Sequence, residues 1–567
     1  MPQDAYTLRY LCAELDGVFK GGKINRIIQP SGDELVLTVY TGKRTEKLLL
    51  NVNPAAPRIG ISKIDGESPK TAPNFCMLMR KHLLSATVTG IELIGFDRIV
   101  KIDFLSSNEF FDAAKKTVYV ELMGRYSNII LTENGKILGG NRGINMFDNG
   151  VRPLIVGKPY VFPPVGDKKL PSDSTLIDAF NSIKKEDVAS AICSNVQGIA
   201  ISTANEIASG YFKDKNTDKI DNGSDFLRYL NEYLFNTKPN PCVIKNGDEI
   251  KDVCVYPYGT VCGEVQYFDT LLSAEDYYFT ERDKLKKFIS KRERLNSVTN
   301  TAIKKVKKRL TAIKAKEKDA LSAEENRIKG ELILSNIYRI PSGADSCVLE
   351  NYYDGSTVEI ALDSRLSQAK NAENYYKKYN KQKRTLTALE PQRKQAEEEL
   401  AYFVSVADEI SLCEDVSELN LIESELLSAG IIADKSRVVA KKQVETFCRT
   451  YNVDGLRVRV GRNNVENDRL VKTSAASDIW LHAKDYHSSH AIIECNGLAV
   501  SERVLLVAAE ICAYYSKGRD GGKTEIVYTE RKNVKKPNKA KAGFVTYDNY
   551  KSMSVSPEKH SEFLKCD

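Results

Sequence analysis

The chain has 567 residues, of which 42% are hydrophobic and 28% are charged, a balance typical of folded globular proteins. This length predicts roughly three or four domains, each large enough to bury a core. No apolar run approaches the ~20 residues of a membrane span, and no signal-peptide pattern opens the chain, so we expect a cytoplasmic protein. The net charge of +7 is modest for this size, and it has meaning only where basic residues are concentrated.

The twelve cysteines are scattered along the chain, and no Cys-x-x-Cys pair occurs. In a long chain of this kind, they are expected to be small buried hydrophobic residues in a reducing compartment. This spacing argues against a zinc ribbon and against a disulfide framework. We therefore expect neither a metal nor another cofactor.

The fold class expected from the patterns is multidomain α+β. Residues 1–172 should form a β-rich domain, because apolar and polar residues alternate in short runs separated by turn signals. These runs are residues 34–40, 47–52, 98–104, 117–123 and 127–132. Residues 173–270 should form a polar helical domain, with one helix from Ser202 to Tyr211.

Residues 271–436 have a different pattern, in which apolar side chains recur at three-four spacing among many lysines. Two such runs flank a turn-rich stretch at about 334–365. This arrangement favours an antiparallel coiled-coil arm with a small β-rich module at its tip, and a long intermolecular coiled coil is the alternative. Pro391 lies within the second run and is expected to kink or restart that helix.

Residues 437–567 are expected to form a compact α/β domain. The segments 455–461 and 524–529 alternate as strands, and a helix with one apolar face lies between them. The loop 531–541 follows, with six basic residues and no acidic one. Such a run can be a solvated surface, but its proline and an expected strand at Gly543–Tyr547 favour an ordered loop that follows a phosphate backbone.

Three of the five histidines and the only tryptophan lie in one stretch, from Trp480 to His490. His482, His487 and His490 could ligate a metal, yet a strand–turn–strand segment would not make their side chains converge as one helical turn does. Two readings remain open. The histidines stabilise the core or a turn, or Trp480 and the imidazoles offer stacking planes to RNA beside Lys484.

Several motifs occur in an order that resembles one family. They are Gly21-Gly-Lys-Ile-Asn-Arg-Ile-Ile-Gln-Pro30, Phe75-Cys-Met-Leu-Met-Arg-Lys-His82, Asp97-Arg98, Glu121-Leu-Met-Gly-Arg-Tyr-Ser-Asn-Ile-Ile-Leu131, Asn371-Ala-Glu-Asn-Tyr-Tyr-Lys-Lys-Tyr-Asn380, Asp478-Ile-Trp-Leu-His482, Ser489-His490 and Val534-Lys-Lys-Pro537. Over essentially its whole length the chain resembles the NFACT proteins of ribosome-associated quality control.

The resemblance implies an N-terminal domain similar in fold to DNA glycosylases of the formamidopyrimidine type, helix-hairpin-helix elements, the arm, and a C-terminal RNA-binding domain. It also implies binding to large ribosomal subunits that carry peptidyl-tRNA. There the protein would recruit alanyl-tRNA for template-free addition of an alanine tail. Peptide transfer would belong to the ribosome, so the protein would not be an enzyme and would act by positioning tRNA.

Carried over by position, the resemblance assigns Asp97 and Arg98 to tRNA recognition, because arginine offers a fork for phosphate and aspartate can orient it. Asp4, Glu121 and Arg125 are assigned to the same surface. The residues expected to contact ribosomal RNA or tRNA from the C-terminal domain are Trp480, His482, Lys484, His490, Lys535 and Lys536.

Two departures from the family pattern affect the C-terminal domain. Ser488 stands where many members have glycine, which predicts a turn that does not need positive φ or one that is strained. The usual Lys-Pro-x-Gly-Ala-Lys-Pro-Gly-Phe becomes Lys536-Pro-Asn-Lys-Ala-Lys-Ala-Gly-Phe544, which leaves the shape of the basic loop open.

Two other functions are considered. A DNA glycosylase would use an N-terminal Pro-Glu pair, whereas this chain has Pro2-Gln3 and no zinc finger follows. A fibronectin-binding adhesin at the cell surface conflicts with the missing export signal.

Overall fold

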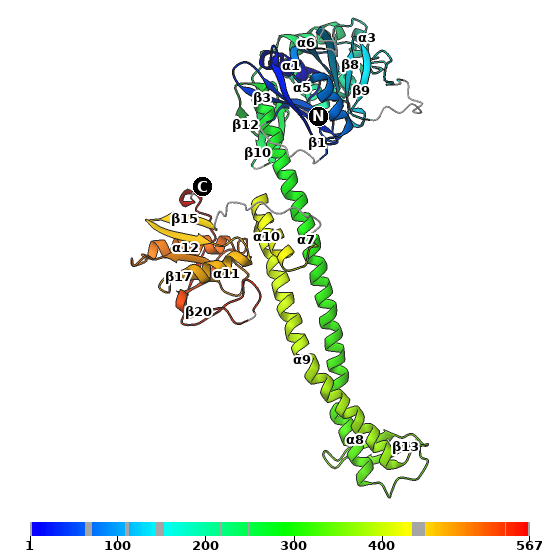
Figure 1. Ribbon diagram of the computed structural model, residues 1–567, viewed down its shortest axis with the longest axis vertical. Helices are drawn as coiled ribbons and strands as arrows, with labels where there is room; N and C mark the ends of the chain where they lie inside the picture. Colours follow the sequence, from blue (N-terminus) through cyan, green and yellow to red (C-terminus); the bar gives the residue numbers. More distant parts are fainter. Residues whose placement is uncertain are drawn as a thin grey trace. The chain divides into compact units, whose positions relative to one another are not determined.

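The computed structural model describes residues 3–62, 71–107, 113–142, 152, 154–215, 217–247, 249–433, 448–538 and 540–564 (Figure 1). The chain divides into two compact units, Met1–Lys284 and Leu285–Asp567. None of the helices formed by the described residues combines the length and apolar character that a membrane span requires.

The first unit is built on a nine-stranded antiparallel sheet, in the order β4-β3-β2-β1-β5-β6-β7-β8-β9. Helices α1 (Ala5–Phe19) and α2 (Asn74–Leu83) pack against it. The strands are β1 (Lys23–Ser31), β2 (Glu34–Tyr40), β3 (Thr45–Asn51), β4 (Arg58–Ile61), β5 (Thr87–Leu93), β6 (Ile99–Ser107), β7 (Ala113–Glu121), β8 (Asn128–Glu133) and β9 (Lys136–Gly140). All five runs predicted as strands overlap strands of this sheet, so the β-rich N-terminal domain is confirmed.

Helices α3 to α6, a small sheet and the start of α7 follow in the described part of the first unit. The sheet has the order β11-β10-β12, and the predicted helix 202–211 lies within α5. The elements are α3 (Leu176–Phe180), α4 (Val188–Asn195), α5 (Ile201–Lys215), α6 (Gly223–Asn236), β10 (Cys242–Asn246), β11 (Glu249–Cys254) and β12 (Glu264–Tyr267). One hydrophobic core joins α1, the large sheet and these helices, so they fold as one body.

The long helical region is confirmed. Its elements are α7 (Leu271–Leu321), α8 (Ala323–Ser335), β13 (Ser346–Glu350), β14 (Thr357–Ala361), α9 (Gln368–Leu412) and α10 (Val416–Ser428). In the second unit α7 and α9 lie side by side with a shared apolar seam (Figure 1). They are antiparallel, because the ion pairs Arg309–Glu399 and Glu317–Arg393 connect earlier positions of α7 to later positions of α9.

Of the two effects expected at Pro391, the restart is wrong, because α9 continues through this residue from Gln368 to Leu412, and the kink stays a prediction. Proline removes one backbone donor from a helix and crowds the preceding turn. The neighbouring side chains Leu389 and Ala396 are buried in the seam with α7, and this burial offsets the local cost.

The C-terminal part of the second unit is a six-stranded antiparallel sheet in the order β15-β16-β18-β17-β19-β22. Helix α12 covers one face, and α11 packs with the other. The elements are β15 (Arg449–Val453), β16 (Leu456–Val460), α11 (Asn464–Thr473), β17 (Ile479–Ala483), β18 (Ala491–Glu494), α12 (Glu502–Tyr514), β19 (Thr524–Glu530), β20 (Val534–Lys535), β21 (Thr546–Tyr547) and β22 (Lys551–Val555). The strand expected at Gly543–Tyr547 is shorter than predicted, since only Thr546 and Tyr547 pair.

Candidate RNA-binding surfaces

The five N-terminal candidates meet at one end of the β6–β7 pair. Ile99 pairs with Glu121, and the Leu122 N–H donates to the Arg98 carbonyl at 2.9 Å, which sets the Asp97-Arg98 turn beside Glu121. Arg125 follows in the short 3₁₀ helix η1 (Gly124–Tyr126).

Asp4 joins the same region through Gly198. The φ of Gly198 is +70°, and a Cβ there would lie 2.4 Å from both the Ala5 Cβ and the Phe96 carbonyl oxygen. Only glycine therefore allows the start of α1 and the residue before Asp97 to approach so closely. The tertiary structure thus gathers residues that are more than 100 positions apart in the sequence.

The Asp97-Arg98 turn is held by its own aspartate. One Asp97 carboxylate oxygen accepts the Arg98 backbone N–H at 2.7 Å. Both side chains are partly exposed. The turn therefore fixes its own backbone at the surface of the domain.

Asp4 is 1% exposed, and its carboxylate faces the protein. It accepts the Thr7 N–H at 2.9 Å, which caps α1, and the Ala200 N–H at 3.0 Å and Thr203 hydroxyl at 2.7 Å, which anchor α5. This burial argues against direct contact with tRNA. Asp4 instead supports the surface by fixing two helix starts.

Glu121 is also buried, at 2% exposure. Arg152 donates to both of its carboxylate oxygens, at 3.1 and 2.7 Å, and the Tyr160 hydroxyl donates at 2.7 Å. Burial, and then the charge of Glu121, raise the pKa of Tyr160, whose ring stacks on Tyr119 at 3.9 Å. Glu121 is therefore a buried anchor. No sequence signal marked Arg152 or Tyr160 as its partners.

Arg125 is exposed, and its guanidinium lies 4.7 Å from the centroid of the Tyr126 ring. Tyr126 is 67% exposed. The pair presents a cation and an aromatic face together, a combination suited to phosphate and base contact. Sequence reasoning named Arg125 and missed Tyr126.

In the C-terminal domain the aromatic cluster converges as a packed group. Trp480 and His482 are nearly parallel at 5.6 Å, and His490 and Tyr547 meet the indole at 5.4 and 5.1 Å. Alternation along β17 puts Trp480 and His482 on the sheet face opposite α12. The sequence placed these residues in strands but could not decide which face they occupy.

The cluster is mostly buried, with Trp480 at 0% and His490 at 1% exposure. Burial lowers the pKa of His482 to about 4, and burial followed by the charge of His482 lowers that of His490 well below its usual value. Both imidazoles are therefore neutral near pH 7. This environment argues against base stacking by Trp480 and His490 and for a structural role, which was one of the two open readings.

The basic loop is docked onto α11. Gly543 has φ +79°, and a Cβ there would lie 2.0 Å from the Asn464 Oδ1, while its N–H donates to Asp468 at 3.1 Å. Both Lys535 and Lys536 are exposed, and Lys536 also pairs with Asp468. The glycine that this chain shares with the family pattern is thus the one that the close approach requires.

Two further candidates are surface residues. Lys484 pairs with Glu525 at 3.1 Å, and His487 is exposed. Ser488 is not among the described non-glycine residues with positive φ, so the first of the two expected outcomes holds and the turn does not need positive φ. Its hydroxyl accepts the Ala483 N–H at 3.0 Å and shapes the turn.

Among the described residues, one group of side chains lies close enough together to hold a metal ion. It consists of Glu510, Glu558 and His560. It contains none of the three clustered histidines. His560 Nε2 lies 2.7 Å from Glu510, and Nδ1 lies 3.1 Å from Glu562. These contacts form an ion-pair network around one imidazole.

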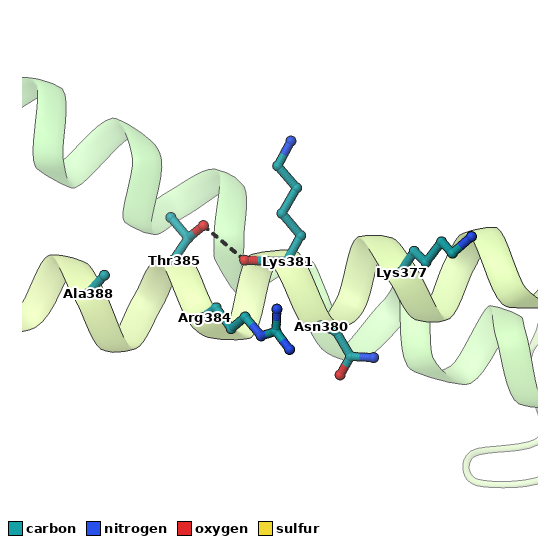
Figure 2. A pocket seen from close by; sticks show the side chains of 6 residues that line it. All are labelled: Lys377, Asn380, Lys381, Arg384, Thr385 and Ala388. Atoms are coloured by element: carbon teal, nitrogen blue, oxygen red, sulfur yellow. Dashed lines mark hydrogen bonds between the residues drawn. The ribbon is translucent and has the colours of Figure 1, made fainter.

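The arm carries a basic groove that sequence reasoning missed. Figure 2 shows side chains of α9 that line it, and no acid is among them. The Thr385 hydroxyl donates to the Lys381 carbonyl at 2.9 Å, and the side chains of Lys377, Lys381 and Arg384 are exposed. The lining residues are Lys377, Asn380, Lys381, Arg384, Thr385 and Ala388. The dense lysine run 377–384 was a signal that could have marked it.

These features define a multidomain protein with several cationic surfaces that suit a polyanion. Residues 4–445 match the model of the NFACT N-terminal and middle domains, and residues 445–549 match that of the NFACT protein RNA binding domain. The chain therefore belongs to the NFACT family, and its C-terminal domain is an RNA-binding domain.

Relatives span nearly the full chain. "Rqc2 homolog RqcH" of Bacillus subtilis is 32% identical over 569 residues, which cover 96% of each chain. Its namesake in Streptococcus pneumoniae D39 is 31% identical over 98% of each chain. The solved N-terminal part of a fibronectin/fibrinogen-binding protein from Streptococcus suis is 25% identical, covers 49% of this chain and 99% of its own, and has a TM-score of 0.42. The family membership and the full-length relatives support a role in ribosome quality control.

Proposed function

We propose that this protein binds large ribosomal subunits obstructed by peptidyl-tRNA, in the cytoplasm, and recruits alanyl-tRNA for template-free alanine tailing of the stalled chain. The observation that carries the proposal is the gathering of Asp97, Arg98 and Arg125 at one end of a sheet, in a chain with full-length relatives of the RqcH type. Asp4 and Glu121 hold this surface from within.

The surface acts by positioning. Arg98 and Arg125 offer donors and positive charge to phosphate, and Tyr126 offers a ring face to a base. Holding two reactants in the right geometry can supply ~7–11 kcal/mol of a barrier. The protein therefore needs no nucleophile of its own, since peptide transfer belongs to the ribosome.

The other two cationic surfaces suit ribosomal RNA. Lys535 in the C-terminal loop is exposed, and the α9 groove is lined by Lys377, Lys381 and Arg384. Contacts of this type bind backbone phosphates, and each is sensitive to salt. They would hold the protein on the subunit while the N-terminal surface holds tRNA.

The test is the double variant Asp97→Ala with Arg98→Ala in cells that accumulate stalled chains. We expect co-sedimentation with large subunits to persist and alanine tails to disappear. The matched control removes a partly exposed surface ion pair of the same domain, Arg44→Ala with Glu46→Ala. Unchanged tailing in the first variant would refute the assignment, and sequencing of bound tRNA identifies the amino acid.

The glycosylase alternative has a specific obstacle. Pro2 lies outside the described residues, and Gln3, at the position of the glycosylase acid, is 4% exposed. Its amide donates to the Ile59 carbonyl at 2.8 Å and accepts the Ile59 N–H at 2.9 Å, so it holds β4 in place. Trapping of a Schiff base on abasic DNA would reinstate that alternative.

A further inference from the structure

Two cysteines face each other in the small sheet of the first unit. Cys242 on β10 and Cys254 on β11 are direct partners in an antiparallel ladder. Residues opposed in this way have Cα atoms about 4.5 or 5.5 Å apart and side chains on the same face. Disulfides need Cα separations of roughly 4.4–6.8 Å, so this register allows one without backbone movement.

No other pair of cysteines in the described part of the chain is opposed in a strand ladder. The contact between the two thiols lowers the pKa of Cys242 and raises that of Cys254. The two thiols are therefore in contact, so that one can attack an oxidant and the other can resolve the oxidised sulfur.

The pair lies in a satellite cluster with Ile244 and Tyr258 rather than in the main core. Cys254 is on β11, which is an edge strand of its sheet. Small clusters at sheet edges open locally at a lower free-energy cost than a core does. A small oxidant can therefore reach two thiols that are buried in the closed structure.

We propose that Cys242 and Cys254 are a dithiol that hydroperoxides convert to an intramolecular disulfide. The thiolate of one cysteine attacks the outer peroxide oxygen, the O–O bond breaks, and the product is a sulfenic acid and an alcohol, or water from hydrogen peroxide. The sulfur of the other cysteine then attacks the sulfenic sulfur, the S–S bond forms, and water leaves. Two thiols thereby lose two electrons and two protons, and one O–O bond gains them.

The disulfide would lie beside the hydrogen-bond network of Asp4, which supports the proposed tRNA surface. Tyr258 belongs to the same cluster, and its hydroxyl lies 3.0 Å from that of Thr203, which donates to Asp4. A disulfide that closes a loop of this length also constrains the unfolded chain. We expect the midpoint of thermal unfolding of the first unit to rise by several degrees on oxidation.

The experiment treats the full-length protein with hydrogen peroxide, blocks the remaining thiols with N-ethylmaleimide in denaturant, and maps tryptic peptides by mass spectrometry. Cys242 is the only cysteine of peptide 229–245, whereas peptide 252–282 contains both Cys254 and Cys262. We expect the two peptides to be cross-linked at least tenfold more than in untreated protein, and dithiothreitol to reverse this.

Two matched variants assign the bond. Cys262→Ser should retain the cross-link, because Cys262 is exposed and outside the ladder, and Cys254→Ser should lose it at least tenfold. A cross-link that disappears in Cys262→Ser, or wild-type protein whose Cys242 stays reduced while exposed thiols oxidise, would overturn the proposal. Thermal melts before oxidation establish that each variant folds, and alanine replaces serine at Cys254 or Cys262 where the serine variant does not.

Discussion

Gly198→Ala should destabilise the first unit and weaken the proposed tRNA surface. The residue has φ +70°, and a Cβ would lie 2.4 Å from the Ala5 Cβ and from the Phe96 carbonyl oxygen. An alanine at positive φ costs about 1–2 kcal/mol, and overpacking against backbone adds about 1–3 kcal/mol. The unfolding free energy should therefore fall by about 3 kcal/mol, because neither neighbour is the end of a flexible side chain.

The matched control is Gly135→Ala. Gly135 has φ +78° in a turn of the same unit, but nothing lies within 4 Å of its Cβ position. The Gly135→Ala variant should lose only the free energy needed to hold an alanine at positive φ, about 1–2 kcal/mol. Urea unfolding of both variants measures the difference in stability. A tRNA-binding assay tests whether displacing Phe96 disturbs the neighbouring Asp97. Equal losses of stability in the two variants would show that the close approach at Gly198 does not constrain the fold.

Three other predictions follow from single contacts. Burial raises the pKa of Glu275 from 4.5 to about 8, so its contribution to stability is complete below 4.5 and is lost as pH rises through about 8. Between pH 4.5 and about 8 the free energy of unfolding should therefore fall by on the order of 4 kcal/mol because of this group, and Glu275→Gln should abolish that fall in urea unfolding. Identical pH profiles of the variant and the wild type would contradict this. Arg152→Ala should lower the free energy of unfolding by about 3 kcal/mol, since it leaves the buried Glu121 carboxylate without its cationic partner. Adding Glu121→Gln should restore part of that loss, and no recovery would argue against the buried pair. Lys535→Ala should lower RNA affinity and reduce the slope of log Kd against log salt by about 0.9. Lys536→Ala should change that slope less, because Lys536 is already paired with Asp468. A larger change in the Lys536 variant than in the Lys535 variant would count against the loop as an RNA contact.

Local pattern was sufficient for much of the fold. Alternation predicted the strands that became β2, β3, β6, β7 and β8, since side chains of a strand alternate between two faces. Three-four spacing predicted the long helices of the arm. The restart expected at Pro391 does not occur, because the effect of a proline is local, whereas the burial of Leu389 and Ala396 against α7 depends on a partner helix that the sequence window does not contain.

The candidate surfaces were predictable as sets of residues but not as geometry. The sequence by itself determined the order of motifs, and with it the family, as well as the cationic character of the loop at 531–541. Only the tertiary structure decided that Asp4 and Glu121 face inward, that Trp480 packs beneath α11, and that Cys242 opposes Cys254. The physical reason is that burial, ion pairing and strand register depend on segments distant in the chain, whereas periodicity and composition report only on neighbours.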